Sequence, residues 1–410
     1  MKTKLESFML VSGGPGMGWK SVLVVFGAVL LINGACDAGD QSPRESDMAE
    51  INNSSGTNGG DASQATINSS GCGESPCFQS AFHQALRGEM NLSGLTTIRL
   101  FVPLGKAGSR LRVTLRSGSG ELEVARAFVA RLAGDGQSAV EAMPLTFGGE
   151  AGARLGPRSS VRSDAAQMEV GFRETVVLSI VARGSAAAGN IRLFPDNQAI
   201  AGDLAEAAWL SGAQALERAV MVSDVSVEGP AGRAFIAIGD SITEGYVEGS
   251  DNYVESWPAV AESLLGLPVV NAGVSGQGLD GALAYLSAEV LAAEGVTDCL
   301  VLIGTNDLGG TSVGQIEANY DLLIDRLAPF CRVHLGVLPP KELAGIQADR
   351  AALNDWIRAH PKASGVIDFA SVLADPDDPT RFADGLGMDG VHPTVEGQRR
   401  MAELAAERLR

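Results

Sequence analysis

Short apolar runs alternate with amphipathic stretches over residues 230–410, and this alternation limits the folds that the region can adopt. Five runs have the length of buried strands, at 234–238, 269–271, 298–303, 332–338 and 366–369. Helical spacing follows at 257–265, 279–291, 313–327, 349–358 and 395–409. Strands that alternate with helices in this way form parallel sheets through right-handed crossovers. We therefore predict a flavodoxin-like, doubly wound α/β domain, with a parallel five-stranded sheet and helices on both faces.

The preceding residues, 78–229, show a different pattern in which apolar and polar residues alternate. Runs at 97–102, 111–115, 124–132, 168–172 and 175–181 have the period of half-buried strands, with Gly and Pro between them. This pattern predicts an all-β, sandwich-like accessory domain. Residues 204–219 are the exception and are interpreted as a helix or a mixed connection. We expect this domain to be a packing module without ligand contacts, and the alternative is a domain that binds carbohydrate or shapes a substrate cleft.

The first 36 residues have the layout of an export signal. Lys20 precedes an apolar run at 21–32, and the small residues Gly34 and Ala35 stand before Cys36. The run is shorter than the roughly 20 residues that cross a bilayer, and its flanks are typical of a secretory signal. Cys36 resembles the lipidated cysteine of a bacterial lipobox, although Asn33 stands where that pattern usually has Leu. We expect lipidation of Cys36, membrane contact through this anchor and a place in the cell envelope. An ordinary cleaved signal, giving a secreted protein, is the alternative.

Residues 37–77 are rich in Ser, Asn and Gly, and such a segment buries too little apolar surface to fold. We predict a flexible linker that ends near Cys72 and Cys77, whose spacing suits a local disulfide in an exported protein. Cys299 and Cys331 remain, and we expect them to be buried free thiols. A bond between them across neighbouring strands is the alternative.

Composition excludes some classes of function. A net charge of -18 disfavours binding to nucleic acid, because an acidic surface repels phosphates. The chain has 5 cysteines and 4 histidines without paired CxxC spacing, so we predict no metal site.

The chemistry is concentrated around Ser241, which follows the first predicted strand directly. Sites of open α/β sheets form at this carboxyl edge. A serine hydroxyl is a weak nucleophile and needs a base, which His392 can provide. Asp389 stands three residues before His392, so one tight turn lets its carboxylate orient the imidazole. Asp384 is the alternative acid, at a less economical spacing. His360 has no such partner and is expected at the surface.

Four motifs resemble the sequence blocks of the SGNH (GDSL) hydrolase family and occur in the order of that family. They are Gly239-Asp240-Ser241, Asn271-Ala272-Gly273-Val274-Ser275-Gly276, Gly304-Thr305-Asn306-Asp307 and Asp389-Gly390-Val391-His392-Pro393. The resemblance covers residues 233–410.

The resemblance implies a serine esterase that works through an acyl-enzyme and needs no cofactor. Ser241 would be the nucleophile, His392 the base and Asp389 the acid. The oxyanion would be bound by the backbone N–H groups of Ser241 and Gly276 and by the amide of Asn306. Gly273 is the alternative to Gly276, and we interpret it as a turn glycine.

The motifs specify ester chemistry without naming the substrate. We expect deacetylation of a carbohydrate, with a lipase or lysophospholipase activity as the alternative. A catalytically vestigial surface protein that binds carbohydrate is the alternative from another class.

Overall fold

The structure is a computed structural model that describes residues 76–189, 197–216, 218–247 and 249–410. The predicted export signal with Cys36 and nearly all of the predicted linker, including Cys72, lie outside these residues. Their roles, and the Cys72–Cys77 bond, therefore stay predictions. Within the described ranges, no helix combines the length and the apolar character that a membrane span requires.

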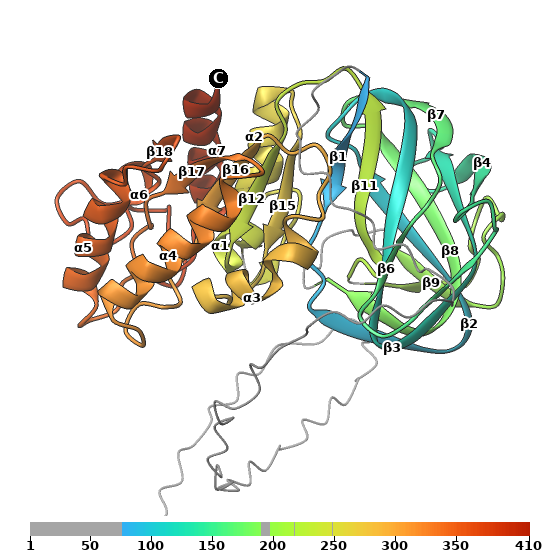
Figure 1. The fold of residues 1–410 in the computed structure, drawn as a ribbon, viewed down its shortest axis with the longest axis horizontal. Helices are drawn as coiled ribbons and strands as arrows, with labels where there is room; N and C mark the ends of the chain where they lie inside the picture. Colours follow the sequence, from blue (N-terminus) through green and yellow to red (C-terminus); the bar gives the residue numbers. More distant parts are fainter. Residues whose placement is uncertain (1–75, 190–196, 217, 248) are drawn as a thin grey trace, which may run out of the picture. The chain divides into compact units, whose positions relative to one another are not determined.

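Residues 230–410, the α/β region, contain a parallel sheet in the order β15-β12-β16-β17-β18 (Figure 1). Its strands are β12 (Phe235–Gly239), β15 (Val269–Gly273), β16 (Asp298–Leu302), β17 (Arg332–Gly336) and β18 (Gly365–Ile367). Strands β15, β12 and β16 are buried along their whole length, which explains why most of their residues are apolar. The strand order reverses at β12, as in flavodoxin-like folds, so the predicted fold class is confirmed.

Two groups of helices cover this sheet, with the sheet between them in Figure 1. One group packs α2 against α7 and α7 against α6, and the other packs α3 against α4 and α4 against α5. The helices of the region are α1 (Ser241–Glu244), α2 (Trp257–Leu265), α3 (Leu279–Glu289), α4 (Val313–Leu327), α5 (Gln347–Arg358), α6 (Ala370–Leu373) and α7 (Val395–Leu409). A short hairpin of β13 (Tyr246–Val247) and β14 (Ser250–Asp251) follows α1.

Local sequence signals fix several helix ends. Ser312 caps α4 by accepting a hydrogen bond from the backbone N–H of Gln315, and Thr394 caps α7 in the same way from Gly397. Gly266 ends α2 in the left-handed conformation, at φ +67°. These signals explain why the predicted bounds of α2, α4 and α7 agree with the structure.

Residues 76–229, the β region, form an antiparallel network, as the prediction of an all-β domain requires. The strands are β1 (Cys77–His83), β2 (Gly88–Pro103), β3 (Gly108–Leu132), β4 (Ala139–Leu145), β5 (Ala153–Leu155), β6 (Ser160–Arg162), β7 (Ala166–Val170), β8 (Thr175–Ala188), β9 (Gln198–Ala201), β10 (Gln214–Ala215) and β11 (Val222–Gly229). Of the two alternatives predicted for residues 204–219, the helix is wrong and the mixed connection agrees with the structure, because the described residues form turns and the short strand β10.

Strand β3 joins the two halves of this network, one with β1 and β11 and the other with β8 and β2. Its first part pairs with β11 and its second part with β8, and the register shifts between Ser117 and Leu122. Gly118 lies in this crossing, where a Cβ would stand 2.3 Å from Oγ of Ser185. The glycine therefore allows one long strand to pass from one half to the other.

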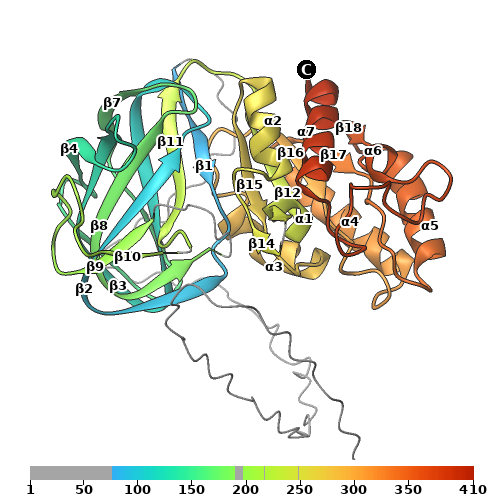
Figure 2. The ribbon, with the colours of Figure 1, turned by 180° about the vertical axis from the view of Figure 1, so that it is seen from behind.

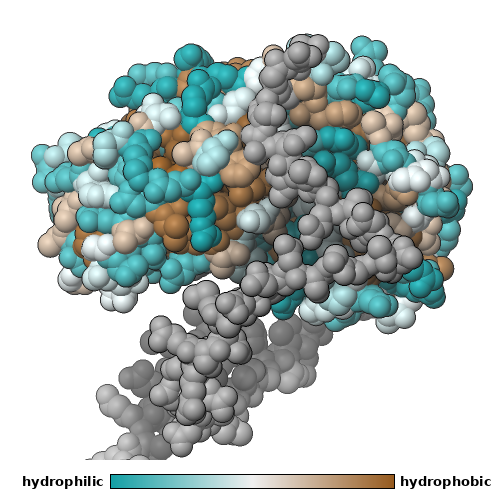
Figure 3. All heavy atoms as spheres, viewed as in Figure 1, coloured by the Kyte–Doolittle hydropathy of each residue, from teal (hydrophilic) through white to brown (hydrophobic). Residues whose placement is uncertain are grey.

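The two regions pack against each other. Figures 1 and 2 show β1 and β11 as the strands of the β region that lie nearest to β15, and β1 contacts β15. The amide nitrogen of Gln79 donates to the backbone oxygens of Gly232 and Gly295, at 2.8 and 2.9 Å. Tyr253 and Ala259 of the α/β region are buried in the core of the β region. The space-filling view shows hydrophilic side chains over much of the visible described surface, with hydrophobic ones between them (Figure 3).

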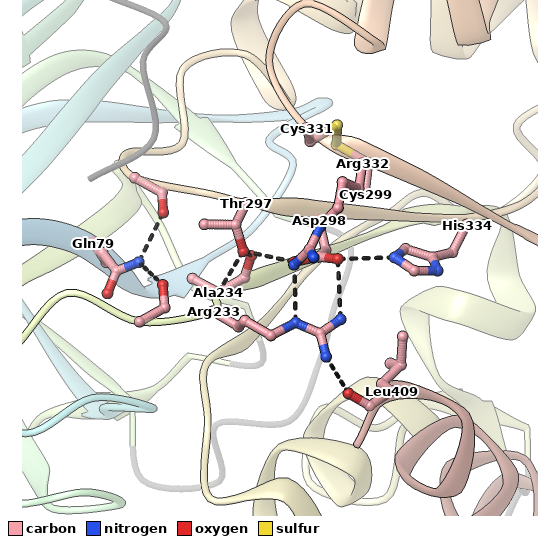
Figure 4. A network of polar contacts seen from close by, with 12 residues as sticks. Gln79, Arg233, Ala234, Thr297, Asp298, Cys299, Cys331, Arg332, His334 and Leu409 are labelled. Atoms are coloured by element: carbon pink, nitrogen blue, oxygen red, sulfur yellow. Dashed lines mark hydrogen bonds and ion pairs between the residues drawn. A yellow bond between two sulfur atoms is a disulfide. The ribbon is translucent and has the colours of Figure 1, made fainter. Parts of the chain in front are cut away.

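A polar cluster fixes the start of the α/β region at the amino end of its sheet (Figure 4). Asp298 is fully buried and accepts hydrogen bonds from Arg233, Arg332 and His334. Burial raises the pKa of its carboxyl, but the hydrogen bonds from His334 and the two arginines outweigh this effect and hold that pKa well below its ordinary value. Arg233 also donates to the carbonyl of Leu409, so the cluster connects the linker between the regions to the last helix.

The cysteines next to this cluster form a disulfide, so the expectation of free thiols at Cys299 and Cys331 is wrong (Figure 4). Cys299 lies in β16 opposite Val333 of β17, and Cys331 directly precedes β17. Their Cα atoms are 5.7 Å apart, within the range that a disulfide closes without backbone movement.

Candidate active site

Ser241 is the first residue of α1, directly beyond the carboxyl end of β12. Asp240 caps this helix, because its Oδ1 accepts a hydrogen bond from the N–H of Ile242 at 2.9 Å. Gly245 ends the helix after one turn at φ +102°, a conformation that favours glycine. The Gly-Asp-Ser sequence therefore places the hydroxyl at the sheet edge where the strand order reverses.

The structure brings Ser241, His392 and Asp389 together in a hydrogen-bonded series. Oγ of Ser241 lies 2.9 Å from Nε2 of His392, and Nδ1 of His392 lies 2.8 Å from Oδ2 of Asp389. A carboxylate can only accept, so the ring proton belongs on Nδ1 and leaves Nε2 free to accept from the serine hydroxyl. Asp384, the alternative acid, is exposed, and Nδ1 of His392 lies against Asp389 in the described structure.

The Asp389 carboxylate is held in its ionised form. Burial raises its pKa, but hydrogen bonds from the backbone N–H and ring of His392 and from the N–H of Val391 outweigh burial, so the pKa lies below its ordinary value. Oδ1 accepts the N–H groups of Val391 and His392 at 3.0 and 2.8 Å, which orients Oδ2 toward the imidazole. One tight turn thus supplies and aligns both acid and base.

The two other predicted oxyanion residues lie on neighbouring loops. Gly276 is exposed at φ +77°, and no atom of the described residues lies within 4 Å of the position that a Cβ would take there. The side-chain amide of Asn306 donates to the carbonyl of Gln277 at 3.0 Å, which joins the two loops. Ser241 stands at the start of α1, where backbone N–H groups have no partner within the helix. The structure thus tethers Asn306 to the loop of Gly276.

Gly273, the alternative to Gly276, is the last residue of β15 rather than part of a turn. A Cβ at Gly273 would stand 2.3 Å from the backbone nitrogen of Glu244. Its small size therefore serves the close packing of α1 on β15, and the interpretation as a turn glycine is wrong.

Three residues near the site were missed by the sequence analysis. The Tyr246 ring lies 4.5 Å from the His392 ring, centroid to centroid. Glu244 accepts hydrogen bonds from the backbone N–H and hydroxyl of Ser275, next to Gly276. Gln277 is buried, its side chain donates to the carbonyl of Gly239, and its own carbonyl accepts from Asn306. All three stand within five residues of Ser241 or Gly276 in the sequence, and this closeness was the signal that could have placed them near the site.

The remaining histidines are committed to structural contacts. His83 is buried, with Nδ1 near Asp224 and Nε2 2.6 Å from the carbonyl oxygen of Glu289. A carbonyl can only accept, so Nε2 of His83 donates to it and cannot take a proton from a nucleophile. His360 is buried against Trp356, at 4.4 Å between ring centroids, and the expected surface position is wrong. Within the ranges that the structure describes, no group of three or more His, Cys, Asp or Glu side chains could hold a metal ion.

A serine, an imidazole and a carboxylate in one hydrogen-bonded series, at the switch point of a doubly wound sheet, form the arrangement that serine hydrolases use. Residues 237–400 match the model of the GDSL-like Lipase/Acylhydrolase family. The chain therefore contains a domain of this family, and it is a hydrolase that acts on esters. The match leaves out the β region.

Three solved structures with similarity to the chain come from bacteria. A protein of the lipolytic G-D-S-L family from Desulfitobacterium hafniense DCB-2 is 26% identical, with 43% of this chain and 99% of that chain covered and a TM-score of 0.39. A member of the same lipolytic family from Veillonella parvula DSM 2008 is 22% identical, with 43% and 97% covered and a TM-score of 0.38. A GDSL-like lipase from Bacteroides thetaiotaomicron VPI-5482 is 21% identical, with 43% and 86% covered and a TM-score of 0.35. None of the curated proteins compared with the chain matches it.

Proposed function

We propose that the chain is a serine esterase that works through an acyl-enzyme on Ser241. The observation that carries this proposal is the contact of 2.9 Å between Oγ of Ser241 and Nε2 of His392, continued to Asp389. Nε2 takes the hydroxyl proton as Oγ attacks the ester carbonyl, and Asp389 stabilises the imidazolium that forms. The Ser241 and Gly276 N–H groups and the Asn306 amide receive the negative charge on the carbonyl oxygen.

The tetrahedral intermediate then collapses, and the bond to the alcohol breaks. The alcohol leaves with the proton from Nε2 of His392, and the acyl group stays on Ser241. A water molecule gives a proton to the same nitrogen as its oxygen attacks the acyl-enzyme, and the acid is released when Nε2 transfers this proton to Oγ of Ser241. The serine proton thus leaves with the alcohol, and a proton from water replaces it on Ser241, so the enzyme is restored without oxidation or reduction and no cofactor is required.

Replacement of the nucleophile tests this mechanism. Ser241→Ala is expected to abolish hydrolysis of p-nitrophenyl acetate and labelling by a fluorophosphonate, because both require the serine oxygen. Ser371→Ala is the matched control, since Ser371 is exposed and its hydroxyl donates to the nearby carbonyl of Asp368. Retained hydrolysis in Ser241→Ala, with the control active, would refute the assignment. A folded wild-type chain that resists labelling would favour the vestigial carbohydrate-binding protein.

We propose an acetylated carbohydrate as the substrate. The support is indirect: the sequence features of export, and a β region that packs against the esterase region through buried contacts. A panel of acetylated sugars and of esters with increasing acyl length tests it. Preference for acetyl sugars is expected, and rising activity with chain length would favour the lipase or lysophospholipase alternative.

We also propose export with a lipid anchor on Cys36. The order of Lys20, the apolar run at 21–32 and the small residues before Cys36 supports it. Intact mass of the protein purified from membranes is expected to show an N-terminal lipidated cysteine. A mature protein with unmodified Cys36, or one without it, would overturn the anchor.

A further inference from the structure

Arg87 of the β region reaches the loop that carries the predicted oxyanion residue Gly276. It lies between β1 and β2, and its Nε donates to both oxygens of Glu289 at 2.7 Å. Its Nη2 donates to Oε1 of Gln277 at 2.5 Å, and its guanidinium lies 3.6 Å from the centroid of the Tyr285 ring. The Arg87 side chain therefore lies along the whole of α3, from Gln277, which precedes the N-cap residue, to Glu289, the last residue of the helix.

Gln277 connects this arginine to the catalytic elements. Its side-chain Nε2 donates to the carbonyl of Gly239 at 3.2 Å, two residues before Ser241. Its own backbone carbonyl accepts the amide of Asn306 at 3.0 Å. Gln277 is 7% exposed, so these contacts lie largely out of water. The residue thus joins the end of the nucleophile's strand and the two oxyanion loops.

Arg87 determines which way the Gln277 amide points. A guanidinium can only donate hydrogen bonds, so it requires the amide oxygen on its side. The amide nitrogen is then directed at the carbonyl of Gly239, which can only accept. Without Arg87 the amide loses one of the two partners that select this orientation, and the loop of Gly276 loses a restraint next to it.

Glu289 holds Arg87 in place. Its side chain is 4% exposed, and its charge is compensated by Arg87 and, at 4.0 Å, by Arg116, both from the β region. A buried carboxylate requires such a partner, because an unpaired buried charge is costly. The ion pair with Glu289 therefore restrains the Arg87 guanidinium in the position from which it donates to Gln277.

We propose that Arg87 is a positioning residue for the esterase reaction, and that the β region is thereby part of the catalytic apparatus. The proposal rests on the proposed function, because it concerns the same oxyanion loops. Arg87 acts through Gln277, which orders Gly276 and Asn306 for the transition state. Displacement of such donors by a fraction of an ångström lowers the rate of the chemical step more than it weakens substrate binding.

A matched pair of interface variants tests the proposal. Arg87→Met removes the contact with Gln277. Arg112→Met is the control, because Arg112 of β3 also forms an ion pair across the interface, with Glu294, and also lies over an aromatic ring, that of Phe78 at 4.1 Å. Activity is expressed per active site titrated with a fluorophosphonate, so that unfolded protein does not count. We expect Arg87→Met to lower kcat for p-nitrophenyl acetate about tenfold with little change in KM, and Arg112→Met to leave kcat within about twofold.

Further variants separate positioning from general stability. Arg87→Lys keeps a cation beside Glu289 but lacks the fork that reaches both partners, so the same loss in kcat is expected with a smaller loss of stability. Gln277→Leu is expected to lower kcat by a similar factor, and Arg87→Met added to it should change kcat by less than about twofold, because the two side chains act in series.

Wild-type kcat per titrated site in Arg87→Met or Arg87→Lys would overturn the proposal. The proposal would also be overturned if the fold losses in kcat of Arg87→Met and Gln277→Leu multiplied in the double variant, because the two residues would then act independently. Failure of the proposed function is a different result, in which the wild-type chain neither hydrolyses the ester nor takes the label.

Discussion

Neutralising Asp240 tests whether the strand that presents the nucleophile carries an unfavourable buried charge. The Asp240 side chain is buried, its Oδ1 is occupied by the N–H of Ile242, and its Oδ2 has no hydrogen-bond partner within the described structure. Burial raises the pKa of this carboxyl to about 6, above the ordinary 3.8, and the nearby charge of Asp307 adds to the rise. The folded state therefore binds this proton more tightly than the unfolded state.

The sign of the pH effect follows from this difference. Between the unfolded pKa and about 6 the folded chain holds more protons than the unfolded chain, so the free energy of unfolding falls as the pH rises through this interval. A shift of about two units corresponds to about 3 kcal/mol, which is fully lost above the folded pKa. Asp240→Asn cannot ionise and removes this dependence.

Urea unfolding of wild type and Asp240→Asn at about pH 4 and about pH 8 measures the effect. The absolute stability of the variant can fall at both values, because its amide nitrogen stands where Oδ2 had no partner. The expected result is therefore a difference: from the lower to the higher pH, the variant gains about 2–3 kcal/mol relative to wild type. An equal pH dependence of the two proteins would refute the reasoning. Asp384→Asn, at an exposed aspartate, is the control for a change of one charge.

Two further predictions concern the disulfide and the acid. Replacing Cys299 and Cys331 together by Ala is expected to lower the free energy of unfolding by about 4 kcal/mol, because the bond closes a loop with a sequence separation of 32; an unchanged urea midpoint would contradict this role. Asp389→Asn is expected to lower kcat about 10³–10⁴-fold at neutral pH, because an amide no longer selects the tautomer with the proton on Nδ1. Asp384→Asn should leave kcat near wild type, and the opposite ranking would assign the acid to Asp384.

The sequence predicted those parts of the α/β region whose signals are local. The five strands and the helices α2, α4 and α7 follow from apolar runs of strand length and from capping residues such as Ser312 and Gly266. The helix α1 was missed because its single turn is shorter than the period that a hydrophobic pattern needs. The proximity of Ser241, Asp389 and His392 was predictable because all three stand where the fold class brings chain segments to one sheet edge.

Features that depend on register or on distant contacts were not predictable in the same way. Bonding of Cys299 to Cys331 requires β16 and β17 to be neighbours with their first residues aligned, and strand order is not a local property. The path of β3 is similar: its alternating pattern predicts strands, but the change of partners near Gly118 depends on how β8 and β11 lie beside it.

Arg87 is separated from Gln277 by 190 residues, so their contact is not a local property of the sequence. The other partner of Arg87, Glu289, does stand out in the sequence. Glu289 continues the buried stripe of α3 formed by Leu279, Ala282 and Leu286, at helical spacing. A carboxylate at position 289 is unfavourable for two reasons: the buried face of α3 is apolar, and the last turn of a helix repels negative charge. A charge that breaks an apolar stripe at a helix end implies a cation from another part of the chain. In this chain that cation is Arg87, and the same geometry that neutralises Glu289 extends the guanidinium to Gln277.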